Sequence, residues 1–409
     1  MKLLVFAHTP PPYHGQSYAV KLMLDSFGGN RRKARVRAQP PNEFGIECYH
    51  VNAQFSRGLE DIGVFQSMKL ARLVFHCFEA IWCHFRYGVE NFYYVPAPGK
   101  SIAVYRDWVV MLLCRPFFKR VIFHWHAAGL AKWLETTVTI RTRSATYHRM
   151  GDADLSIVLS DFNRRDAEKL LAKRVAIVSG GIPDPCPQFE KEILPSRKKR
   201  IALRKKIFAG EISNVNDAVK IVNVLFLAHC TRQKGAFDTV GAIALANEKL
   251  AGENSPLRFR LTMIGAFASE TEEKELREIA NHRDVKNFVE ILGFVPVERK
   301  EQALRDADIF CFPTYYLAEN QPGNLLEAMA FGLPIVTTRW RSIPEMLPEN
   351  YPGIVDPKSP AQIAAALRVA AMADVSEELR GRFLNHFTIK QHLEKMAEAI
   401  HSVENKNHG

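Results

Sequence analysis

The sequence predicts an α/β protein built from two doubly wound domains. Twelve short apolar runs, rich in β-branched and aromatic residues, alternate with helix-like segments along the 409 residues. Most of these runs are continuously apolar rather than alternating, which is typical of parallel strands covered by helices on both faces. Two successive series of such β-α units indicate two doubly wound sheets.

The expected strands divide equally between the two halves of the chain, with helical segments between them. In the first half they are 2–8, 47–53, 91–96, 120–126, 154–160 and 175–181. In the second half they are 220–228, 259–265, 287–293, 308–314, 334–338 and 353–356. A further segment, 388–404, has apolar residues at helical spacing and follows the last strand.

The stretch GGIPDPCPQ (180–188) predicts the domain boundary. Its three prolines and two glycines interrupt any regular element. We therefore expect a first domain over 1–183, a second over 184–386, and a C-terminal helical segment over 387–409.

Composition excludes several classes of protein. Hydrophobic residues make up 47% and charged residues 24% of the chain, as in ordinary globular proteins. No run approaches the eighteen or so apolar residues of a membrane-spanning helix, and the N-terminus is expected to be a first strand rather than a signal peptide. The seven cysteines include no CxxC pair, so we expect buried thiols rather than a zinc ribbon or disulfides.

The net charge of +11 is concentrated in two basic runs. Residues 31–37 carry five basic groups and residues 197–206 carry seven. Such runs suit an anionic membrane surface or an anionic ligand, and the alternative is two solvated loops. No recognition motif accompanies the charge, so nucleic-acid binding is not expected.

Ligands of doubly wound sheets bind beyond the carboxyl ends of the strands, so we searched the loops that follow strands. After the first strand, Gly15 and Gln16 open a helix, and a glycine there allows close approach to backbone amides. The loop lacks GxGxxG, which disfavours a nicotinamide site. After the fourth strand, His126 is the expected active-site histidine. His124 is expected to lie in the core, because a metal pair would need a third ligand that is not nearby.

Two loops of the second domain carry further candidates. Lys234 and Gly235 start a helix after the domain's first strand, and Arg232 precedes them, a combination suited to a phosphate; a solvated lysine is the alternative. The segment ENQPGNLLEAMAFGLPIVTT (319–338) places Glu319 before a turn and Glu327 in the expected first turn of a helix.

The spacing of these two carboxylates suggests a nucleotide sugar. A carboxylate near a helix start is favoured electrostatically, which is a sufficient structural reason for Glu327. A ribose, however, offers two adjacent hydroxyls that such a carboxylate can bind. The backbone amides around Gly323 and Asn324, which we expect to form the turn and the helix N-cap, can then hold a diphosphate. Glu319 would reach the sugar.

The E-x7-E pattern, followed by EAMAFGLPIVTT and SIPEML, resembles the second domain of retaining GT-B glycosyltransferases of family GT4, also called glycosyl transferase group 1. The Lys-Gly helix start, ADIFCFPT, SGGI and HFTIKQH fit the same family. The resemblance implies two Rossmann-like domains facing a cleft, with the active site in the cleft. It also implies that the C-terminal helix, 387–409, crosses back to the first domain.

The resemblance also implies roles for individual residues. Glu327 would bind the ribose, Lys234 the diphosphate, and Glu319 the transferred sugar. His126 would contact the sugar or the acceptor. The full set of expected donor-binding residues is Gly15, Gln16, His229, Arg232, Lys234, Gly265, Phe294, Gly323, Asn324, Leu325 and Glu327, and the expected catalytic residues are Glu319 and His126.

Three positions depart from the family pattern. His229 stands where an arginine is usual, so either Arg232 substitutes for it or His229 contacts phosphate differently. Gly15-Gln16 replaces a Gly-Gly pair, and ENQP replaces Glu-Pro-Phe-Gly.

The expected reaction is metal-independent hexosyl transfer with retention. The acceptor hydroxyl approaches from the side on which the nucleotide leaves, and Lys234, Arg232 and backbone amides stabilise the leaving diphosphate. No cofactor is expected. Each of the sequences DAD at 152–154 and 306–308 ends where a strand begins, which favours a structural role over a metal site.

The expected partners are a UDP- or GDP-linked donor, a glycan or lipid-linked acceptor of a cell-surface or exopolysaccharide pathway, and an anionic membrane. The expected location is the cytoplasm, at the inner face of the membrane. Two alternatives use the same fold: a non-hydrolysing sugar-nucleotide epimerase and a non-catalytic polysaccharide-assembly protein. A third, nucleic-acid binding, would show strong salt dependence.

Overall fold

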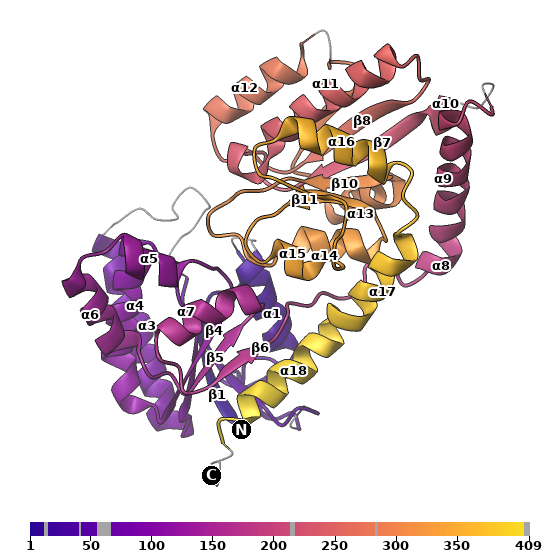
Figure 1. Cartoon of the computed structure of the whole chain (residues 1–409). Coiled ribbons are helices and arrows are strands. Elements are labelled where there is room, and N and C mark those ends of the chain that lie inside the picture. Colours follow the sequence, from indigo (N-terminus) through magenta and orange to yellow (C-terminus); the bar gives the residue numbers. More distant parts are fainter. Residues whose placement is uncertain (12–14, 41, 55–66, 213–216, 283–284, 405–409) are drawn as a thin grey trace. The chain divides into compact units, whose positions relative to one another are not determined.

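The computed structural model describes residues 1–11, 15–40, 42–54, 67–212, 217–282 and 285–404 (Figure 1). The chain divides into two compact units. Unit 1 comprises Met1–Gly181 and Ile389–Gly409, and unit 2 comprises Ile182–Thr388. The sequence places the corresponding limits at 183/184 and 386/387, close to these junctions.

The sheet of unit 1 is entirely parallel, with strand order β2-β1-β3-β4-β5-β6. Its strands are β1 (Lys2–Ala7), β2 (Glu47–Asn52), β3 (Asn91–Tyr94), β4 (Arg120–Trp125), β5 (Leu155–Val158) and β6 (Val175–Ile177). Its helices are α1 (Gly15–Ser26), α2 (Ala34–Arg37), α3 (Ser67–Tyr87), α4 (Ser101–Cys114), α5 (Leu130–Thr136), α6 (Ile140–Met150), α7 (Arg164–Lys169) and α18 (Ile389–His401), with 3-10 turns η1 (Arg115–Phe117) and η2 (Asp161–Asn163).

Alternate residues of each strand enter two different cores. Leu4 and Phe6 of β1 pack with residues of α3 and α4, whereas Leu3 and Val5 pack with residues of α1 and α18. Figure 1 shows α3, α4 and α6 on one side of this sheet and α1 and α18 on the other. Both faces are thus buried, which explains why the strands are continuously apolar.

The sheet of unit 2 is also entirely parallel, with strand order β12-β11-β10-β7-β8-β9. Its strands are β7 (Ile221–Leu227), β8 (Arg258–Ile264), β9 (Val289–Gly293), β10 (Ile309–Phe312), β11 (Ile335–Thr338) and β12 (Ile354–Val355). Its helices are α8 (Phe189–Glu192), α9 (Leu194–Phe208), α10 (Asp217–Lys220), α11 (Ala236–Gly252), α12 (Glu270–Ala280), α13 (Val297–Asp306), α14 (Gly323–Ala330), α15 (Ile343–Met346), α16 (Pro360–Ala370) and α17 (Ser376–His386), with the 3-10 turn η3 (Arg232–Lys234).

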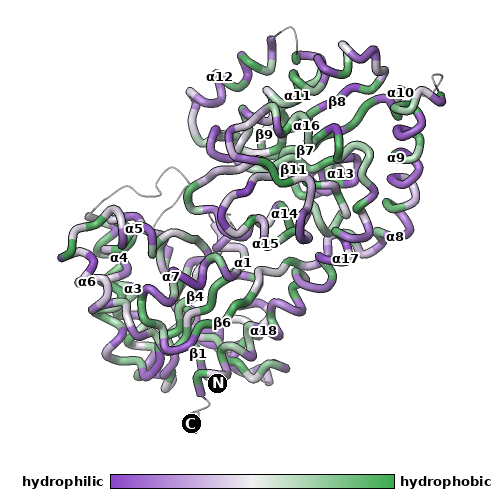
Figure 2. Tube along the Cα trace, viewed as in Figure 1, coloured by the Kyte–Doolittle hydropathy of each residue, from purple (hydrophilic) through white to green (hydrophobic). Residues whose placement is uncertain are grey.

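All twelve predicted strands are present, and the prediction of two doubly wound parallel sheets is confirmed. Strands such as β6 and β11 consist mainly of hydrophobic residues (Figure 2). In each sheet the direction of strand succession reverses once, between β1 and β3 in unit 1 and between β7 and β10 in unit 2. Ligands of doubly wound sheets bind beyond the carboxyl ends of the strands at such a point of reversal.

The two DAD sequences have the structural role that their position indicates. Asp154 precedes β5 and accepts a hydrogen bond from the Val121 amide at 2.8 Å. Asp308 precedes β10 and accepts one from the Asn223 amide at 2.9 Å. Each carboxylate therefore joins two neighbouring strands at the amino edge of its sheet.

The basic run 197–206 is not a solvated loop but part of α9. Arg197 and Arg204 are each only 1% exposed. Arg204 pairs with Asp308 at 2.6 Å, and Arg200 pairs with the same carboxylate at 2.9 Å. The three arginines are therefore buried or ion-paired inside unit 2, whereas the four lysines of the run are exposed.

The basic run 31–37 is also partly structural. Arg31 is 3% exposed and donates hydrogen bonds to backbone carbonyl groups, including those of Val36 and Arg37. Arg32 pairs with Glu79 at 2.6 Å. Only the remaining members of the run, Lys33, Arg35 and Arg37, are exposed.

All seven cysteines are buried thiols, as the spacing predicts. Among the helices of the described ranges, none combines the length and apolar character needed to cross a membrane.

Candidate functional site

The strongest constellation of polar groups lies where the strand order of unit 2 reverses. The loop after β7 carries Lys234, and the loop after β10 carries Glu319. Because β7 and β10 are hydrogen-bonded neighbours, their carboxyl ends bring these loops together. The Lys234 ammonium lies 2.5 Å from a carboxylate oxygen of Glu319, with the two side chains 19% and 9% exposed.

Lys234 is presented by a short turn before α11. It ends η3, whose first turn is capped by the Thr231 hydroxyl, which accepts a hydrogen bond from the Lys234 amide. Gly235 follows with a positive φ of 83°, and a Cβ there would lie 2.4 Å from the carbonyl oxygen of Pro313. The ammonium also lies 4.6 Å from the centre of the Tyr316 ring, so an aromatic face stabilises its charge.

Glu319 is held by its own loop. The Thr314 hydroxyl donates to a Glu319 carboxylate oxygen at 3.0 Å. The loop is itself anchored to the next one, since Trp340 donates through its indole nitrogen to the Tyr316 carbonyl at 2.8 Å. The carboxylate is therefore fixed in position before any ligand binds, which lowers the entropy cost of binding.

Gly265, in the loop after β8, allows this loop to lie close to the loop after β7. Its φ is 151°, and a Cβ there would lie 1.8 Å from the carbonyl oxygen of Ala228. The backbones of the loops after β7 and β8 therefore lie directly against each other at Gly265. This explains the glycine sterically, without reference to a ligand.

His229 lies between these loops, half-buried. Burial lowers its pKa most, the nearby Lys234 ammonium lowers it further, and a hydrogen bond with the Ala266 backbone opposes both. Its Nδ1 atom is buried without a hydrogen-bond partner. A neutral imidazole cannot supply the permanent charge of the arginine expected at this position, although it can exchange a hydrogen bond with a ligand.

Arg232 is directed elsewhere in the described structure. Its guanidinium pairs with Glu275 of α12 and lies 3.9 Å from the centre of the Phe237 ring. The side chain is half exposed. Arg232 would have to leave Glu275 before it could act as a phosphate ligand beside Lys234.

Glu327 has a cationic partner that the sequence did not predict. Its carboxylate pairs with the Lys300 ammonium of α13, and both side chains are about one quarter exposed. The expectation that Glu327 lies in the first turn is wrong, because α14 begins at Gly323 and Glu327 is its fifth residue. The N-cap is Pro322, whose carbonyl accepts from the Leu325 amide, rather than Gly323 or Asn324.

Two amide side chains lie at the start of α14: the buried Asn320 in the turn before the helix, and the partly buried Asn324 in the helix's first turn. Asn324 donates to the Leu227 carbonyl at 2.7 Å, which joins this turn to the end of β7, while its Oδ1 has no partner. Asn320 is 2% exposed, accepts from the Ser342 hydroxyl at 2.8 Å, and has a buried Nδ2 without a partner. Leu325 is fully buried, so only its backbone could face a ligand.

The remaining predicted donor residues are less constrained. Phe294 is 83% exposed after β9, which leaves its ring available for stacking. A Cβ on Gly323 or on Gly15 would meet nothing within 4 Å. Gly15 and Gln16 are the first residues of α1 in unit 1, and the preceding residues 12–14 lie outside the described ranges.

Unit 1 contributes a cluster of histidines. His126 directly follows β4, and its ring centre lies 4.1 Å from that of His124. His124 is 1% exposed, its Nδ1 lies 2.6 Å from the Tyr93 hydroxyl, and burial lowers its pKa well below the usual range. His392 of α18 stacks 6.5 Å away and contacts the Ser179 carbonyl at 2.8 Å. His124 is thus a core residue, as expected.

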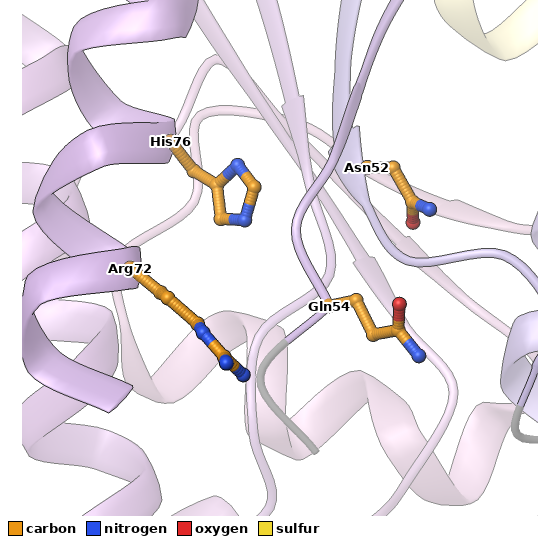
Figure 3. A pocket seen from close by; sticks show the side chains of 4 residues that line it. All are labelled: Asn52, Gln54, Arg72 and His76. Carbon is orange, nitrogen blue, oxygen red and sulfur yellow. The ribbon is translucent and has the colours of Figure 1, made fainter. Parts of the chain in front are cut away.

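A cavity of about 280 Å³ also lies in unit 1, at the carboxyl end of β2 (Figure 3). Asn52 lines it from the end of β2, Gln54 from the segment that follows this strand, and Arg72 and His76 from α3. Asn52 accepts a hydrogen bond from the Thr9 amide, and Gln54 donates to the Pro11 carbonyl, so the cavity adjoins the loop after β1. In the described ranges, no group of three or more His, Cys, Asp or Glu side chains is arranged to hold a metal ion.

Part of unit 2 matches a known protein family. Residues 212–382 match the family model described as glycosyl transferases group 1. The chain is 29% identical over 161 residues to the putative colanic acid biosynthesis glycosyltransferase WcaL of Escherichia coli, and 30% identical over 150 residues to the amylovoran biosynthesis glycosyltransferase AmsK of Erwinia amylovora. These matches cover 38% and 36% of this chain, and only 37% and 35% of the two relatives.

Solved structures match over nearly the whole chain. Anabaena HepE in complex with UDP and glucose superimposes with a TM-score of 0.62 at 14% identity, covering 98% of this chain and 100% of that one. The sucrose-phosphate synthase of Thermosynechococcus elongatus superimposes with a TM-score of 0.65 at 14% identity, covering 99% of each. At such identities the likeness concerns the fold. The chain thus has the GT-B fold, and residues 212–382 of its second unit are similar to the glycosyl transferases group 1 family.

Proposed function

We propose that the protein is a glycosyltransferase that moves a sugar from a nucleotide diphosphate sugar to an acceptor hydroxyl. The observation that carries the proposal is the Lys234–Glu319 pair at the point of strand reversal, inside the segment that matches the family model. The Lys234 ammonium can bind a phosphate, and the neighbouring Glu319 carboxylate is already oriented to bind sugar hydroxyls.

The donor is proposed to be a UDP- or GDP-linked sugar. Structural neighbours from Anabaena were solved with UDP and with UDP-glucose, which supports a donor of this class. On this chain Lys234 would bind the diphosphate, and the amides at the start of α14 would add hydrogen bonds. When the diphosphate enters, Lys234 gains a second anionic neighbour, and Glu319 can turn its remaining acceptor capacity toward the sugar.

Glu327 is proposed to bind the ribose hydroxyls. Its ion pair with Lys300 orients the carboxylate, and about one quarter of its side-chain surface stays accessible. The unpartnered Nδ1 of His229, after β7, and the unpartnered Oδ1 of Asn324, in the first turn of α14, could complete the contacts with the nucleotide. Gly265 and Phe294 are proposed to border the nucleoside.

The proposed chemistry is retaining and independent of metal. The acceptor oxygen bonds to the anomeric carbon as the bond to the donor phosphate breaks, and the departing diphosphate takes the acceptor proton. Charge accumulates on the leaving diphosphate, where Lys234 stabilises it electrostatically. In unit 1, Gly15 and Gln16 are proposed to bind the donor, and His126 is proposed to contact the sugar or the acceptor.

The biological context is proposed from the relatives. Their names place WcaL in colanic acid biosynthesis and AmsK in amylovoran biosynthesis, so a role in exopolysaccharide assembly is proposed here. The acceptor would be a glycan or a lipid-linked glycan, used in the cytoplasm at the inner face of the membrane.

Thermal shift with a panel of nucleotide sugars tests the proposal. The correct donor at 100 times its Kd stabilises the folded protein by about 2.7 kcal/mol, whereas nucleoside monophosphates should do far less. Incubation of that donor with candidate acceptors, followed by NMR of the new anomeric proton, then reports transfer and retention. If no nucleotide sugar stabilises the protein, the proposal is wrong. If the sugar changes configuration without any acceptor, the protein is an epimerase.

A further inference from the structure

Helix α3 of unit 1 is apolar on two opposite sides. One side enters the core of unit 1 through Leu73, Cys77, Ala80 and Cys83. The other side is exposed and carries Met68, Phe75, Phe78, Trp82 and Phe85, which are 50–71% exposed. These exposed residues recur at intervals of three, four and seven, so they form one continuous stripe along the helix.

The stripe continues onto the neighbouring elements. Helix α4 packs beside α3, and the ring centres of Phe85 and Phe117 lie 5.9 Å apart. Exposed apolar residues of α4 and η1 are Ile102, Tyr105, Leu112 and Phe117. The stripe and these four residues together are called the α3–α4 apolar face.

The charge around this face is strongly positive. Helices α3, α4 and α6, which lie on the same side of the sheet (Figure 1), carry seven basic and only two acidic residues. Glu79 pairs with Arg32, and the buried Asp107 pairs with Arg106, so the three helices carry a net charge of +5 (seven basic minus two acidic residues). The basic residues are Lys69, Arg72, Arg86, Arg106, Arg141, Arg143 and Arg149.

Unit 2 shows what an ordinary surface of this chain looks like. Its exposed apolar residues are dispersed over different elements, for example Leu245 on α11, Ile279 on α12 and Val369 on α16. Isolated residues of this kind are normal on soluble surfaces, whereas a contiguous aromatic surface indicates an interaction site. The α3–α4 apolar face is of the second kind.

We propose that the α3–α4 apolar face docks on an anionic lipid bilayer. Phenylalanine and tryptophan side chains partition into the interfacial region of a bilayer, and lysine and arginine beside them bind anionic headgroups. A second copy of the chain fits less well, because pairing this face with itself would oppose two positively charged surfaces. The inference sharpens the proposed membrane contact by naming its surface, and it does not depend on the donor chemistry.

Cosedimentation of the full chain with vesicles tests the proposal. Vesicles of phosphatidylcholine mixed with the anionic lipid phosphatidylglycerol are compared with vesicles of pure phosphatidylcholine. We expect tighter binding to the anionic vesicles, weakened by salt. The double substitution Phe78→Ser and Trp82→Ser should lower the partition coefficient at least about tenfold, since each side chain loses apolar burial. The matched control is Leu245→Ser with Ile279→Ser in unit 2, which should bind as the wild type does.

The other outcomes contradict the proposal. Equal binding by the Phe78→Ser and Trp82→Ser variant would exclude this face as the docking surface. Equal binding to both vesicle types would exclude recognition of anionic lipid. A wild-type dimer by light scattering that the double substitution separates, without vesicle binding, would assign the face to a second copy. Thermal shift with the donor, measured on the same preparations, shows whether the variants are folded and reports the donor site separately.

Discussion

The carboxyl edges of the two sheets differ in chemistry although both sheets are parallel and six-stranded. In unit 2 the edge carries ion pairs, Lys234 with Glu319 and Lys300 with Glu327. In unit 1 it carries His126 against the buried, uncharged His124. The same β-α architecture therefore presents ion pairs between lysine and glutamate in one unit and a pair of histidines in the other. The chemistry lies in the loops rather than in the fold.

The glycines of the two edges should respond most differently to substitution. Gly265→Ala in unit 2 forces a Cβ to within 1.8 Å of a backbone oxygen, so we expect a loss of more than about 4 kcal/mol in the free energy of unfolding. Gly15→Ala in unit 1 meets nothing and should change stability by less than about 0.5 kcal/mol. Urea unfolding of both variants measures the difference, and equal losses would contradict the steric account.

The two strand-joining aspartates give the next largest contrast. Asp308 is 3% exposed in its side chain and pairs with Arg200 and Arg204, whereas Asp154 is 23% exposed and pairs with Lys173 at the surface. Asp308→Asn leaves a buried guanidinium uncompensated and should cost about 3–5 kcal/mol. Asp154→Asn should cost about 1 kcal/mol. Chemical denaturation at pH 7 measures both, and similar costs would contradict the difference in burial.

Asp308 also predicts a pH dependence. Burial raises its pKa, but the pairing with Arg204 and Arg200 and the Asn223 amide outweigh burial and hold the pKa below its usual range. Because the folded-state pKa is depressed, its contribution to stability is complete above the unfolded value of about 3.9 and is lost as pH falls through the folded value. The wild type should therefore lose stability below about pH 4 more steeply than Asp308→Asn. Parallel acid-side curves would contradict this.

Substitutions at the two expected catalytic residues should lower kcat to different extents. Glu319→Gln removes the charge that positions the sugar, and we expect kcat to fall by about 10²–10³ with the fold intact. His126→Gln in unit 1 keeps a hydrogen-bonding side chain at this position, so the fall in kcat should be about tenfold or less. Steady-state kinetics with the identified donor distinguish the two, and a larger effect at His126 would move the main catalytic role to unit 1.

Arg232 should give the smallest effect. Its ion pair with Glu275 is half exposed on both sides, and such pairs contribute about 0–1 kcal/mol. Arg232→Gln should therefore leave the melting temperature nearly unchanged and weaken donor binding less than Lys234→Met. A loss as large as that of Lys234→Met would show that Arg232 leaves Glu275 to bind the donor and replaces the arginine absent at position 229.

The features that could be predicted from the sequence are those that depend on local patterns of apolar residues. Every strand, the parallel pairing, and the structural roles of Asp154 and Asp308 follow from runs of four to nine residues and what flanks them. The Lys234 turn and the two glutamates were visible as motifs. The start of α14 could not be predicted from sequence. Glycine and asparagine are common N-cap residues, yet the N-cap is Pro322 rather than Gly323 or Asn324.

Partners that are distant in sequence could not be predicted. Lys300 reaches Glu327 across 27 residues, and Arg232 reaches Glu275 across 43, with no local pattern that marks either pair. The arginines of α9 look like a solvated run in sequence, yet Arg197 and Arg204 are buried because carbonyl and carboxylate acceptors in unit 2 meet them. His392 reaches His124 only because α18 returns to unit 1. Such contacts depend on tertiary packing.

Titration calorimetry with the nucleoside diphosphate of the identified donor tests the central claim most directly. Wild type, Lys234→Met and Lys198→Met are compared, because Lys198 is also an ion-paired lysine of unit 2 but lies on the exposed side of α9. Loss of a charge-assisted hydrogen bond of about 1.5–3 kcal/mol should raise the Kd at least about tenfold for Lys234→Met and leave it unchanged for Lys198→Met. A Lys234→Met variant that binds the diphosphate as tightly as the wild type would contradict the account.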